Sequence, residues 1–321
     1  MTVHNSPDRV KGIPMSPSLR PYLDETDYWR VRQFLREVFL LNGRREFAWS
    51  LLRWDYWRWH VQENIFNFNL AEAVFVWEQA GDIAAVLNAD SPGEAFLQAH
   101  PRFRTPALEA EMLEIAEQRL AGPNREGQRA LRVWADSNDL ARQALLRDRG
   151  YARGDWPEYQ RRRPLAQPIP DAPAPAGYVI RPLGDAAELP ARSWVSWKAF
   201  HPDEPDDKYE GWEWYRNVQR GPLYRRDLDL VAALPDGAIA AFCTVWFDDV
   251  TRTAVFEPVG THPDHQQRGL GKAVMAEGLR RAGRLGATLA TVGSYSAPAH
   301  ALYSALGFTD YDLSEPWTRT W

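Results

Sequence analysis

A short glycine-containing loop between a predicted strand and a predicted helix constrains the fold most strongly. Residues 253–261 are predicted to form a strand, with apolar residues at Val255 and Val259, and a helix is predicted at about residues 270–285. The loop between them contains Gln266-Gln267-Arg268-Gly269-Leu270-Gly271. A strand that turns directly into a helix indicates an α/β chain with a ligand site at the start of that helix.

The residues of this loop predict an anion site. Gly269 and Gly271 let the backbone turn sharply and approach a ligand without a Cβ in the way. The N–H groups of the first helical turn lack partners within the helix, and the helix dipole adds positive potential there. Arg268 and Lys272 add full positive charges. A diphosphate is the expected occupant.

Two other phosphate-binding patterns are excluded at this loop. A dinucleotide-binding fingerprint needs a third glycine, and Val274 stands at that position. A P-loop needs glycine followed by Lys-Ser or Lys-Thr, which occurs nowhere in the chain. The predicted diphosphate therefore belongs to another kind of ligand.

Predicted strands and helices alternate along the second half of the chain. A helical region follows the first strand, because Trp194, Trp197 and Phe200 recur at a spacing of three. Further helices are predicted at residues 270–285 and 297–306. The predicted strands are residues 179–183, 228–233, 238–247, 253–261, 288–292, 308–313 and 317–321. The pattern predicts an α/β (α+β) fold with a mixed, mostly antiparallel sheet flanked by helices.

The two halves of the chain share three short landmarks in the same order, which suggests a duplicated domain. The pairs are Leu19-Arg20-Pro21 with Ile180-Arg181-Pro182, His100-Pro101 with His262-Pro263, and Gly150-Tyr151 with Gly307-Phe308. Residues 164–177 are rich in proline and alanine and are predicted to be an extended linker between the copies. Residues 1–18 are polar and are predicted to be a disordered tail.

Composition favours a cytoplasmic protein that binds neither nucleic acid nor membranes. The formal net charge is −5, and no apolar run is long enough to span a bilayer. A single cysteine, Cys243, excludes an internal disulfide and is predicted to be a small buried hydrophobic residue. The run Arg161-Arg162-Arg163 is predicted to be a solvated strand end.

A second motif lies downstream of the loop, at residues 296–308. It matches N-x-x-A-x-x-L-Y-x-x-x-G-F, and the loop itself matches Q/R-x-x-G-x-G/A. In this order and at this spacing, residues 178–321 resemble the GNAT superfamily of acyl-CoA-dependent N-acyltransferases. One departure is Ser296, which stands where the family usually has asparagine, although serine can also cap a helix.

The resemblance implies acetyl-CoA as the acyl donor and no metal. In this family the pyrophosphate lies on the backbone of the glycine loop, and pantetheine pairs with the free edge of the preceding strand. Gly260 is expected at a β-bulge in that edge, and the N–H near Val259 is expected to polarise the thioester carbonyl. The residues expected to bind the donor are Val259, Gly260, Thr261, Gln266, Gln267, Arg268, Gly269, Leu270, Gly271, Lys272, Ser296 and Ala299.

Two side chains are candidates for proton transfer. Tyr303 matches the family tyrosine that protonates the leaving thiolate, and its alternative role is that of a core aromatic residue. Glu257 is the candidate base, because strand alternation puts it on the same face as Val259 and Thr261 and an ammonium acceptor must lose a proton. The alternative for Glu257 is a solvated carboxylate. His262 is a weaker candidate for the base, since a histidine before this proline is common in the family as loop structure.

The acceptor in this family usually meets the helical region after the first strand. Acidic and aromatic residues gather there and would suit a cationic amine, although a soluble loop with a core face explains the same composition. These residues are Trp194, Trp197, Phe200, His201, Asp203, Glu204, Asp206, Asp207, Tyr209, Trp212, Trp214 and Tyr215.

The first half, residues 19–163, is predicted to be a degenerate copy, and residues 178–321 the active domain. Arg104–Glu109 replaces the glycine loop, and Glu109 would repel a pyrophosphate in the first helical turn. Leu146 stands where the second half has Tyr303. The first half is therefore expected to bind no CoA and to support the second half or line its acceptor cleft.

The chain is thus predicted to be an N-acetyltransferase that moves an acetyl group from acetyl-CoA to a small-molecule primary amine. Transfer is expected by direct attack in a ternary complex, in a monomer or homodimer. The alternatives are a CoA-binding sensor or interaction module without turnover, and a thiol-cofactor biosynthetic acyltransferase similar to mycothiol synthase. An aminoacyl-tRNA-dependent transferase is disfavoured, because the acidic charge argues against binding tRNA.

Overall fold

The computed structural model describes residues 16–321, and the predicted tail, residues 1–18, lies outside this range except for its last three residues. The elements of the first half are β1 (Ser18–Pro21), α1 (Glu25–Leu41), α2 (Leu51–Tyr56), η1 (Trp57–Phe66), α3 (Leu70–Ala73), β2 (Val74–Gln79), β3 (Asp82–Ala89), β4 (Glu94–Ala99), α4 (Pro106–Arg119), β5 (Gly122–Pro123), β6 (Arg129–Asp136), α5 (Leu140–Asp148), β7 (Ala152–Arg153) and β8 (Glu158–Pro164). The elements of the second half are β9 (Val179–Pro182), η2 (Ala186–Glu188), α6 (Leu189–Phe200), η3 (Asp206–Lys208), α7 (Tyr215–Val218), η4 (Arg226–Leu228), β10 (Asp229–Ala233), β11 (Ile239–Asp248), β12 (Thr253–Thr261), η5 (Pro263–His265), α8 (Leu270–Arg284), β13 (Leu289–Ser294), α9 (Ala297–Ala305) and β14 (Asp310–Thr320).

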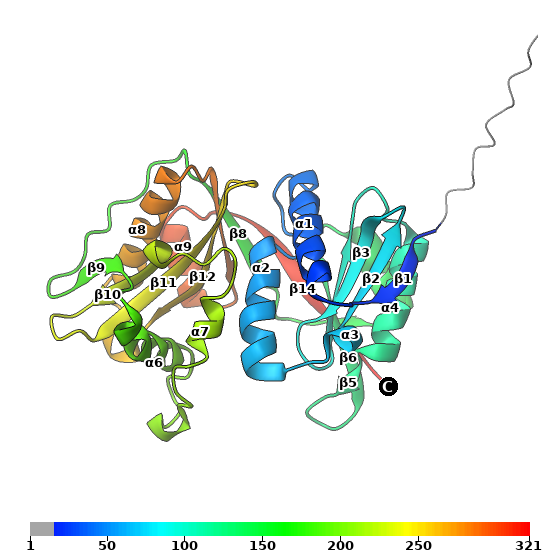
Figure 1. The fold of residues 1–321 in the computed structure, drawn as a ribbon, viewed down its shortest axis with the longest axis horizontal. Coiled ribbons are helices and arrows are strands. Elements are labelled where there is room, and N and C mark those ends of the chain that lie inside the picture. Colours follow the sequence, from blue (N-terminus) through cyan, green and yellow to red (C-terminus); the bar gives the residue numbers. More distant parts are fainter. Residues whose placement is uncertain (1–15) are drawn as a thin grey trace, which may run out of the picture.

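One continuous sheet runs through both halves (Figure 1). Its strand order is β1-β2-β3-β4-β6-β14-β8-β13-β12-β11-β10-β9, with β5 beside β6 and β7 beside β14. The β4–β6 and β12–β13 pairs are parallel, and the other pairs are antiparallel. Helices cover the sheet, so the predicted α/β class with a mixed, mostly antiparallel sheet is confirmed.

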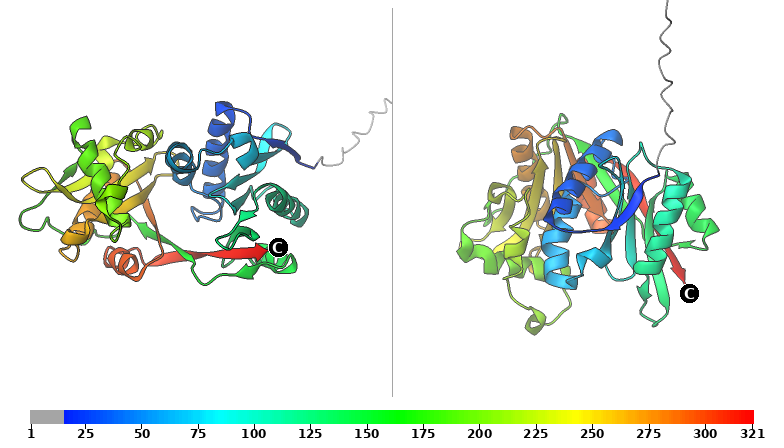
Figure 2. Two further views of the ribbon diagram at one scale, coloured as in Figure 1. Left: turned by 90° about the horizontal axis from the view of Figure 1, so that it is seen from below. Right: turned by 45° about the vertical axis from the view of Figure 1, so that its right-hand side comes forward.

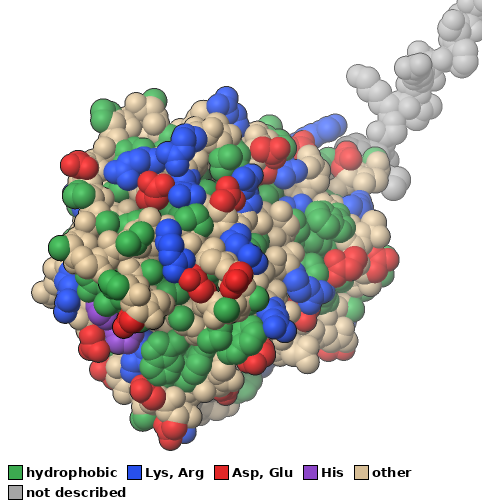
Figure 3. Space-filling view, turned by 60° about the vertical axis from the view of Figure 1, so that its left-hand side comes forward, with side chains coloured by type: hydrophobic (Ala, Val, Ile, Leu, Met, Phe, Trp, Pro, Cys, Tyr) green, Lys and Arg blue, Asp and Glu red, His purple; other side chains and the backbone are tan. Residues whose placement is uncertain are grey.

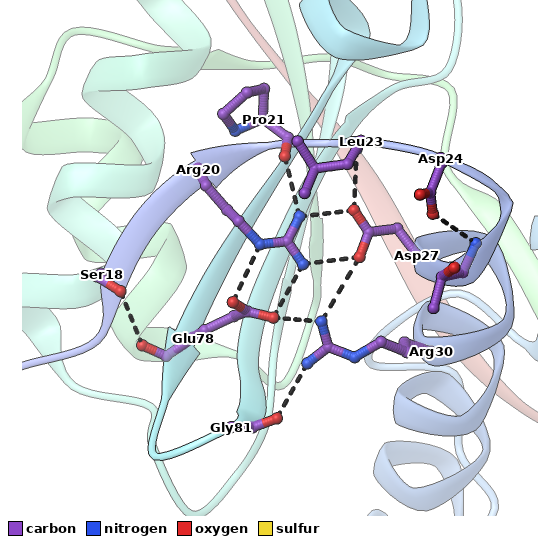
Figure 4. A network of polar contacts seen from close by, with 10 residues as sticks. Ser18, Arg20, Pro21, Leu23, Asp24, Asp27, Arg30, Glu78 and Gly81 are labelled. Carbon is purple, nitrogen blue, oxygen red and sulfur yellow. Dashed lines mark hydrogen bonds and ion pairs between the residues drawn. The ribbon is translucent and has the colours of Figure 1, made fainter.

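The same ion-pair motif opens both halves of the chain. Arg20 donates to the two carboxylate oxygens of Asp27 at 2.6 and 2.7 Å, and to the carbonyl oxygen of the next residue at 3.0 Å (Figure 4). Arg181 donates to Glu188 at 2.8 and 2.6 Å and likewise to the next carbonyl oxygen at 3.0 Å. In each half the N–H three residues after the arginine also donates to that carboxylate. Both members lie 161 residues from their counterparts, so the sequence landmark corresponds to a repeated local structure.

The two halves exchange strands at their junction. β8, at the end of the first half, pairs with β13 of the second half, and β14 pairs with β8 along one edge and with β6 along the other. The left view in Figure 2 shows β14 running from one half to the other. Two separate strands were expected at residues 308–313 and 317–321, and this prediction is wrong. Residues 314–316 stay paired with β6, so the strand continues through them.

The arginine run in β8 is interior to the sheet, so the predicted solvated strand end is wrong. Arg161 is 5% exposed, and its guanidinium donates to Ser294 Oγ at 3.0 Å and to the Phe308 carbonyl oxygen at 3.1 Å. Arg163 is 1% exposed and donates to carbonyl oxygens of residues 167 and 168. These partners come from distant elements and from the following loop, and the charges of the run alone do not reveal them.

Residues 165–177 have no regular secondary structure, as expected, but they do not form a free spacer. Ala172 is buried in the hydrophobic core of the second half, and Leu165 and Ile169 pack against that core. The segment therefore packs against the second half at these three residues while it joins β8 to β9.

A hydrophobic cluster crosses between the halves. Leu52 of α2 is buried together with Phe242 and Trp246 of β11, and Tyr56 packs against the same cluster. The strand exchange and this shared core hold α2 of the first half against the sheet of the second half. Several tryptophans of the first half are also core residues, and the fully buried ones include Trp54, Trp57 and Trp77.

The surface carries both signs of charge. Figure 3 shows Lys and Arg side chains interspersed with Asp and Glu over one face, and a group of hydrophobic side chains at its lower edge. Among the helices of residues 16–321, none combines the length and apolar character needed to cross a bilayer.

Candidate active site

The glycine loop ends in an open helix start, as predicted from the sequence. Gly269 is the N-cap of α8 and has φ +84°, and Gln267 also has a positive φ of +60°. Glycine adopts this left-handed conformation without steric cost, which explains its presence at the N-cap. Gln266 N–H donates to the Pro263 carbonyl, and Ala273 N–H donates to the Gly269 carbonyl. The N–H groups between these two bonds lie at the positive end of the α8 dipole and are available to an anion.

The second glycine and the basic residues of the loop have distinct surroundings. A Cβ on Gly271 would lie 3.3 Å from Leu302, so glycine lets the first turn of α8 pack closely against α9. Arg268 donates to the Asp264 carbonyl at 3.0 Å and to the Tyr178 hydroxyl at 3.3 Å, so part of its role is to hold the loop. Lys272 follows on the half-buried first turn of the helix.

β12 separates from its neighbour before it reaches this loop. It pairs with β13 only from Thr253 to Val255, and the rest of β12 has no partner on that edge among the described strands. The free edge therefore contains the residues expected to pair with pantetheine, Val259 to Thr261. The splayed geometry agrees with the resemblance noted in the sequence.

The bulge in β12 lies three residues earlier than expected. The β11–β12 register shifts between the Cys243–Val259 and Val245–Phe256 pairs, so Glu257 and its proline neighbour lie opposite a single residue of β11. Gly260 is paired regularly, and the predicted bulge at Gly260 is wrong. Glycine is required there for another reason, because a Cβ would lie 2.5 Å from the Phe242 ring and 2.9 Å from Ala199.

A cavity of about 360 Å³ lies between the two halves beside the free edge of β12. Glu257, Val259 and Tyr303 line it from the second half. The remaining lining residues are Glu46, Ser50, Arg53, Tyr56, Trp57, Val61, Asp90, Glu158, Gln160, Phe200, Val255, Phe256, Pro258, Gly293 and Tyr295. The first half thus forms one wall of this cavity, and both candidates for proton transfer face it.

Glu257 lies in the bulge, where its side chain is exposed to the solvent of the cavity. The enclosing walls desolvate the carboxylate and raise its pKa to about 7, with Glu158 and Asp90 adding repulsion and Arg53 opposing it. The Trp246 indole N–H donates to the Glu257 carbonyl oxygen and holds the backbone at the bulge. A carboxylate with a pKa near neutrality is suited to accept a proton from a substrate.

Tyr303 lies on α9 and is 7% exposed. Burial raises the pKa of its hydroxyl well above the ordinary value, and Cys243 and Glu257 add to this rise while Arg161 opposes it. The ring packs against Phe308, at 6.2 Å between centroids. Tyr303 lines the cavity and stays protonated at neutral pH, so it is suited to donate a proton there.

The other candidates occupy structural positions. His262 Nδ1 accepts the Asp264 N–H at 3.2 Å, which fits the loop role weighed for it in the sequence. Cys243 is fully buried, and burial raises the pKa of its thiol, as expected of a small core residue. Ser296 is the N-cap of α9 and accepts the Ala299 N–H at 3.4 Å, so the serine does cap the helix.

The sequence did not identify the first-half residues of the cavity, or Tyr295 and Gly293 at the end of β13. Glu46, Asp90 and Glu158 are far apart in the chain, and only the fold brings them together. No motif marks them. Of the acidic and aromatic residues expected to meet the acceptor after β9, only Phe200 lines this cavity.

The first half has an ion network where the second half has its glycine loop. Arg104 donates to Glu109 at 2.9 and 3.0 Å and to Asp139, and Arg142 also pairs with Glu109. Burial opposes ionisation of Glu109, but the two guanidinium groups hold its pKa below the ordinary value. Thr105 caps α4 and accepts the Leu108 N–H at 3.1 Å, as predicted. The start of α4 thus carries its own counter-charge.

Comparison with known proteins agrees with this geometry. Residues 188–308 match the model of the Acetyltransferase (GNAT) family. A mycothiol acetyltransferase of Nocardioides sp. is 31% identical over 265 residues, which cover 75% of this chain and 83% of the relative. A second, from Thermomonospora curvata, is 31% identical over 228 residues, covering 70% and 72%.

Two solved structures share the fold over nearly the whole chain. A GCN5-related N-acetyltransferase from Sphaerobacter thermophilus superposes with a TM-score of 0.65 at 17% identity, covering 95% of each chain. A tandem GNAT protein from the clavulanic acid biosynthesis pathway has a TM-score of 0.64 at 17% identity, covering 95% of this chain and 98% of the other. The family match and the relatives that are 31% identical show that the chain belongs to the GNAT acetyltransferase family, and its two repeated halves and the tandem GNAT neighbour assign it to the two-domain type.

Proposed function

We propose that this protein is an N-acetyltransferase that uses acetyl-CoA to acetylate a small primary amine held in the cavity between its halves. The observation that carries the proposal is the continuity of three features along β12 and α8. These are the cavity with Glu257 and Tyr303, the free edge of β12, and the open start of α8. An extended donor with a diphosphate at one end and a thioester at the other matches that order.

The donor residues follow from these surfaces. The N–H groups from Gln267 to Lys272 would hold the pyrophosphate, and Lys272 would add charge. The free edge from Val259 to Thr261 would pair with the pantetheine arm. Gln266, Leu270, Ser296 and Ala299 would complete the set along the starts of α8 and α9. The positive φ at Gly269 and the Cβ clash avoided at Gly260 fit a ligand that follows this backbone closely.

Bound acetyl-CoA supplies the thioester carbonyl, at which a C–N bond to the amine forms while the C–S bond breaks. Glu257 takes one proton from the acceptor ammonium, directly or through water, and so provides the free amine. Tyr303 gives its proton to the departing sulfur and regains one from the nitrogen as the amide forms. Glu257 returns its proton to solvent, so one proton is released for each acetyl group transferred.

Direct transfer from donor to acceptor fits the environment of the cysteine better than a covalent acyl-enzyme. Cys243 is fully buried and its pKa is raised, so it lacks the accessible thiolate that a nucleophile needs. Both substrates would therefore be bound together before transfer.

The test is thiol release from acetyl-CoA with a panel of small primary amines. We expect turnover with at least one amine, and Tyr303→Phe should lower kcat by about 10²-fold or more while the thermal unfolding midpoint stays near that of the wild type. A Tyr311→Phe variant is the matched control, because Tyr311 lies on β14 outside the cavity lining. Wild-type turnover in Tyr303→Phe would refute the role of that residue, and no turnover with any amine would favour a CoA-binding sensor.

A second candidate function comes from the relatives named mycothiol acetyltransferase. Because one of them aligns over 83% of its length, the same acceptor, a cysteinyl amino sugar in thiol-cofactor biosynthesis, is a specific alternative. Including the des-acetyl precursor of mycothiol in the amine panel separates the two. A kcat/KM for that precursor far above every simple amine would assign this acceptor.

A further inference from the structure

The glycine loop before α8 has little packing of its own to hold its shape. Residues 266–269 are all exposed. Gln267 nevertheless has a positive φ of +60°, a left-handed conformation that a residue other than glycine keeps only when its surroundings impose it. The N–H groups at the start of α8 follow Gln267 directly, so the shape of the loop decides where they point. Contacts from outside the loop therefore have to hold it.

One such contact comes from Tyr178, which follows the proline-rich linker and precedes β9. Its hydroxyl lies 2.8 Å from His265 Nδ1 and accepts from the Arg268 guanidinium at 3.3 Å. A hydroxyl that accepts from Arg268 still has its own proton to donate to the ring nitrogen of a neutral imidazole. Arg268 also donates to the Asp264 carbonyl oxygen at 3.0 Å. One hydroxyl thus bridges two side chains of the loop, one on either side of Gln267.

Tyr178 is itself held in place by its neighbours in the chain and by the core. Its N–H donates to the Pro175 carbonyl oxygen at 3.1 Å and closes a turn in which Gly177 has φ +85°. The next residue, Val179, pairs with Ala233 in the sheet. The Tyr178 side chain packs against the hydrophobic core of the second half. The sheet and the core therefore fix the position from which the hydroxyl reaches the loop.

We propose that Tyr178 is a positioning residue for the acyl donor. Through His265 and Arg268 it holds the glycine loop in the shape that presents the N–H groups of the α8 start to the pyrophosphate. This inference rests on the proposed use of acetyl-CoA and adds a residue to that donor site. Tyr178 does not line the cavity that contains Glu257 and Tyr303. Its hydroxyl should therefore affect binding of the donor and not the transfer of the acetyl group.

The first test measures CoA binding by calorimetry and needs no turnover. Tyr178→Phe keeps the ring and its packing but removes both bonds of the hydroxyl, so the thermal unfolding midpoint should stay near that of the wild type. We expect the Kd for CoA to rise about three- to tenfold, which is the net worth of roughly one hydrogen bond. Tyr311→Phe, on β14, is the matched control and should keep the wild-type Kd.

The second test compares two acetyl donors in the reaction with an amine that turns over. Tyr178→Phe should raise the KM for acetyl-CoA severalfold, with kcat and the KM for the amine unchanged. Acetyl-pantetheine lacks the diphosphate that the loop would bind, so its kcat/KM should be the same in the wild type and the variant. In an Arg268→Met background the effect of Tyr178→Phe on acetyl-CoA should shrink, because part of the contact is already lost.

The outcomes separate this inference from the proposed function. An unchanged Kd for CoA in Tyr178→Phe would overturn the inference. An equal loss with acetyl-pantetheine would also overturn it, because the variant would then act by a general distortion. Weaker CoA binding in Tyr178→Phe, with no acetylation of any amine by the wild type, would instead refute the proposed function and support the role of Tyr178 in holding the loop.

Discussion

The pKa of Glu257 gives a quantitative prediction for the pH dependence of acetyl transfer. A carboxyl with a pKa of about 7 is about one-tenth ionised at pH 6, half ionised at pH 7 and nine-tenths ionised at pH 8. If its ionised form is the base, kcat/KM should rise about fivefold from pH 6 to pH 7 and less than twofold from pH 7 to pH 8. A carboxylate with the ordinary value of 4.5 would contribute almost no change over this range.

The assay must separate the ionisation of Glu257 from the ionisation of the acceptor amine. Glu257→Gln keeps the size of the side chain but cannot accept the proton, and we expect kcat/KM at pH 8 to fall by about 10²–10⁴-fold. The amine titrates identically in both reactions, so the ratio of wild-type to variant kcat/KM at each pH isolates the contribution of Glu257. This ratio should follow a single ionisation centred near pH 7.

Two charged neighbours of Glu257 predict the direction in which the midpoint of this ionisation should move when each of them is replaced. Glu158 raises the pKa of Glu257, so Glu158→Gln should move the midpoint to lower pH. Arg53 lowers it, so Arg53→Gln should move the midpoint to higher pH. A flat ratio between pH 6 and pH 8, or shifts of the opposite sign in these two variants, would refute the assignment of Glu257 as the base.

Three more predictions follow from the fold. Gly260→Ala places a Cβ against Phe242, so it should lower the free energy of unfolding in urea by about 1–3 kcal/mol and raise the KM for acetyl-CoA. An unchanged free energy of unfolding would contradict this packing. Arg192→Met leaves buried Asp229 without its cation and should cost about 3–5 kcal/mol in the same assay, whereas exposed Arg225→Met should cost little. Calorimetry should find one acetyl-CoA per chain, because Glu109 opposes a second at α4.

The parts of the site that could be predicted are those carried by local motifs. The open start of α8 follows from Gly269, whose positive φ only glycine adopts freely, and the cap of α9 follows from Ser296. The position of Tyr303 beside the cavity follows from its motif and the helical period. In each case the residues that determine the structure lie within a few positions of each other.

The parts that could not be predicted depend on contacts between distant segments. Strand alternation predicted Glu257 on the same face as Val259, and both residues line the cavity, but the bulge in β12 includes Glu257 itself and not Gly260. The acidic residues that the first half adds to the cavity include Glu46, in the loop between α1 and α2, and Glu158, in β8. The arginine run of β8 looks solvent-exposed in sequence, because its partners belong to strands and loops that follow it in the chain.

The strand exchange also bears on how the chain is made. β14 follows all the other described strands along the chain and is the neighbour of β6 in the first half. During synthesis the first half therefore emerges with the edge of β6 uncovered, and the missing strand is made last. An uncovered edge can pair with another chain, so we expect that the pairing of β14 with β6, rather than emergence of the first half, is the step that protects the nascent protein from aggregation.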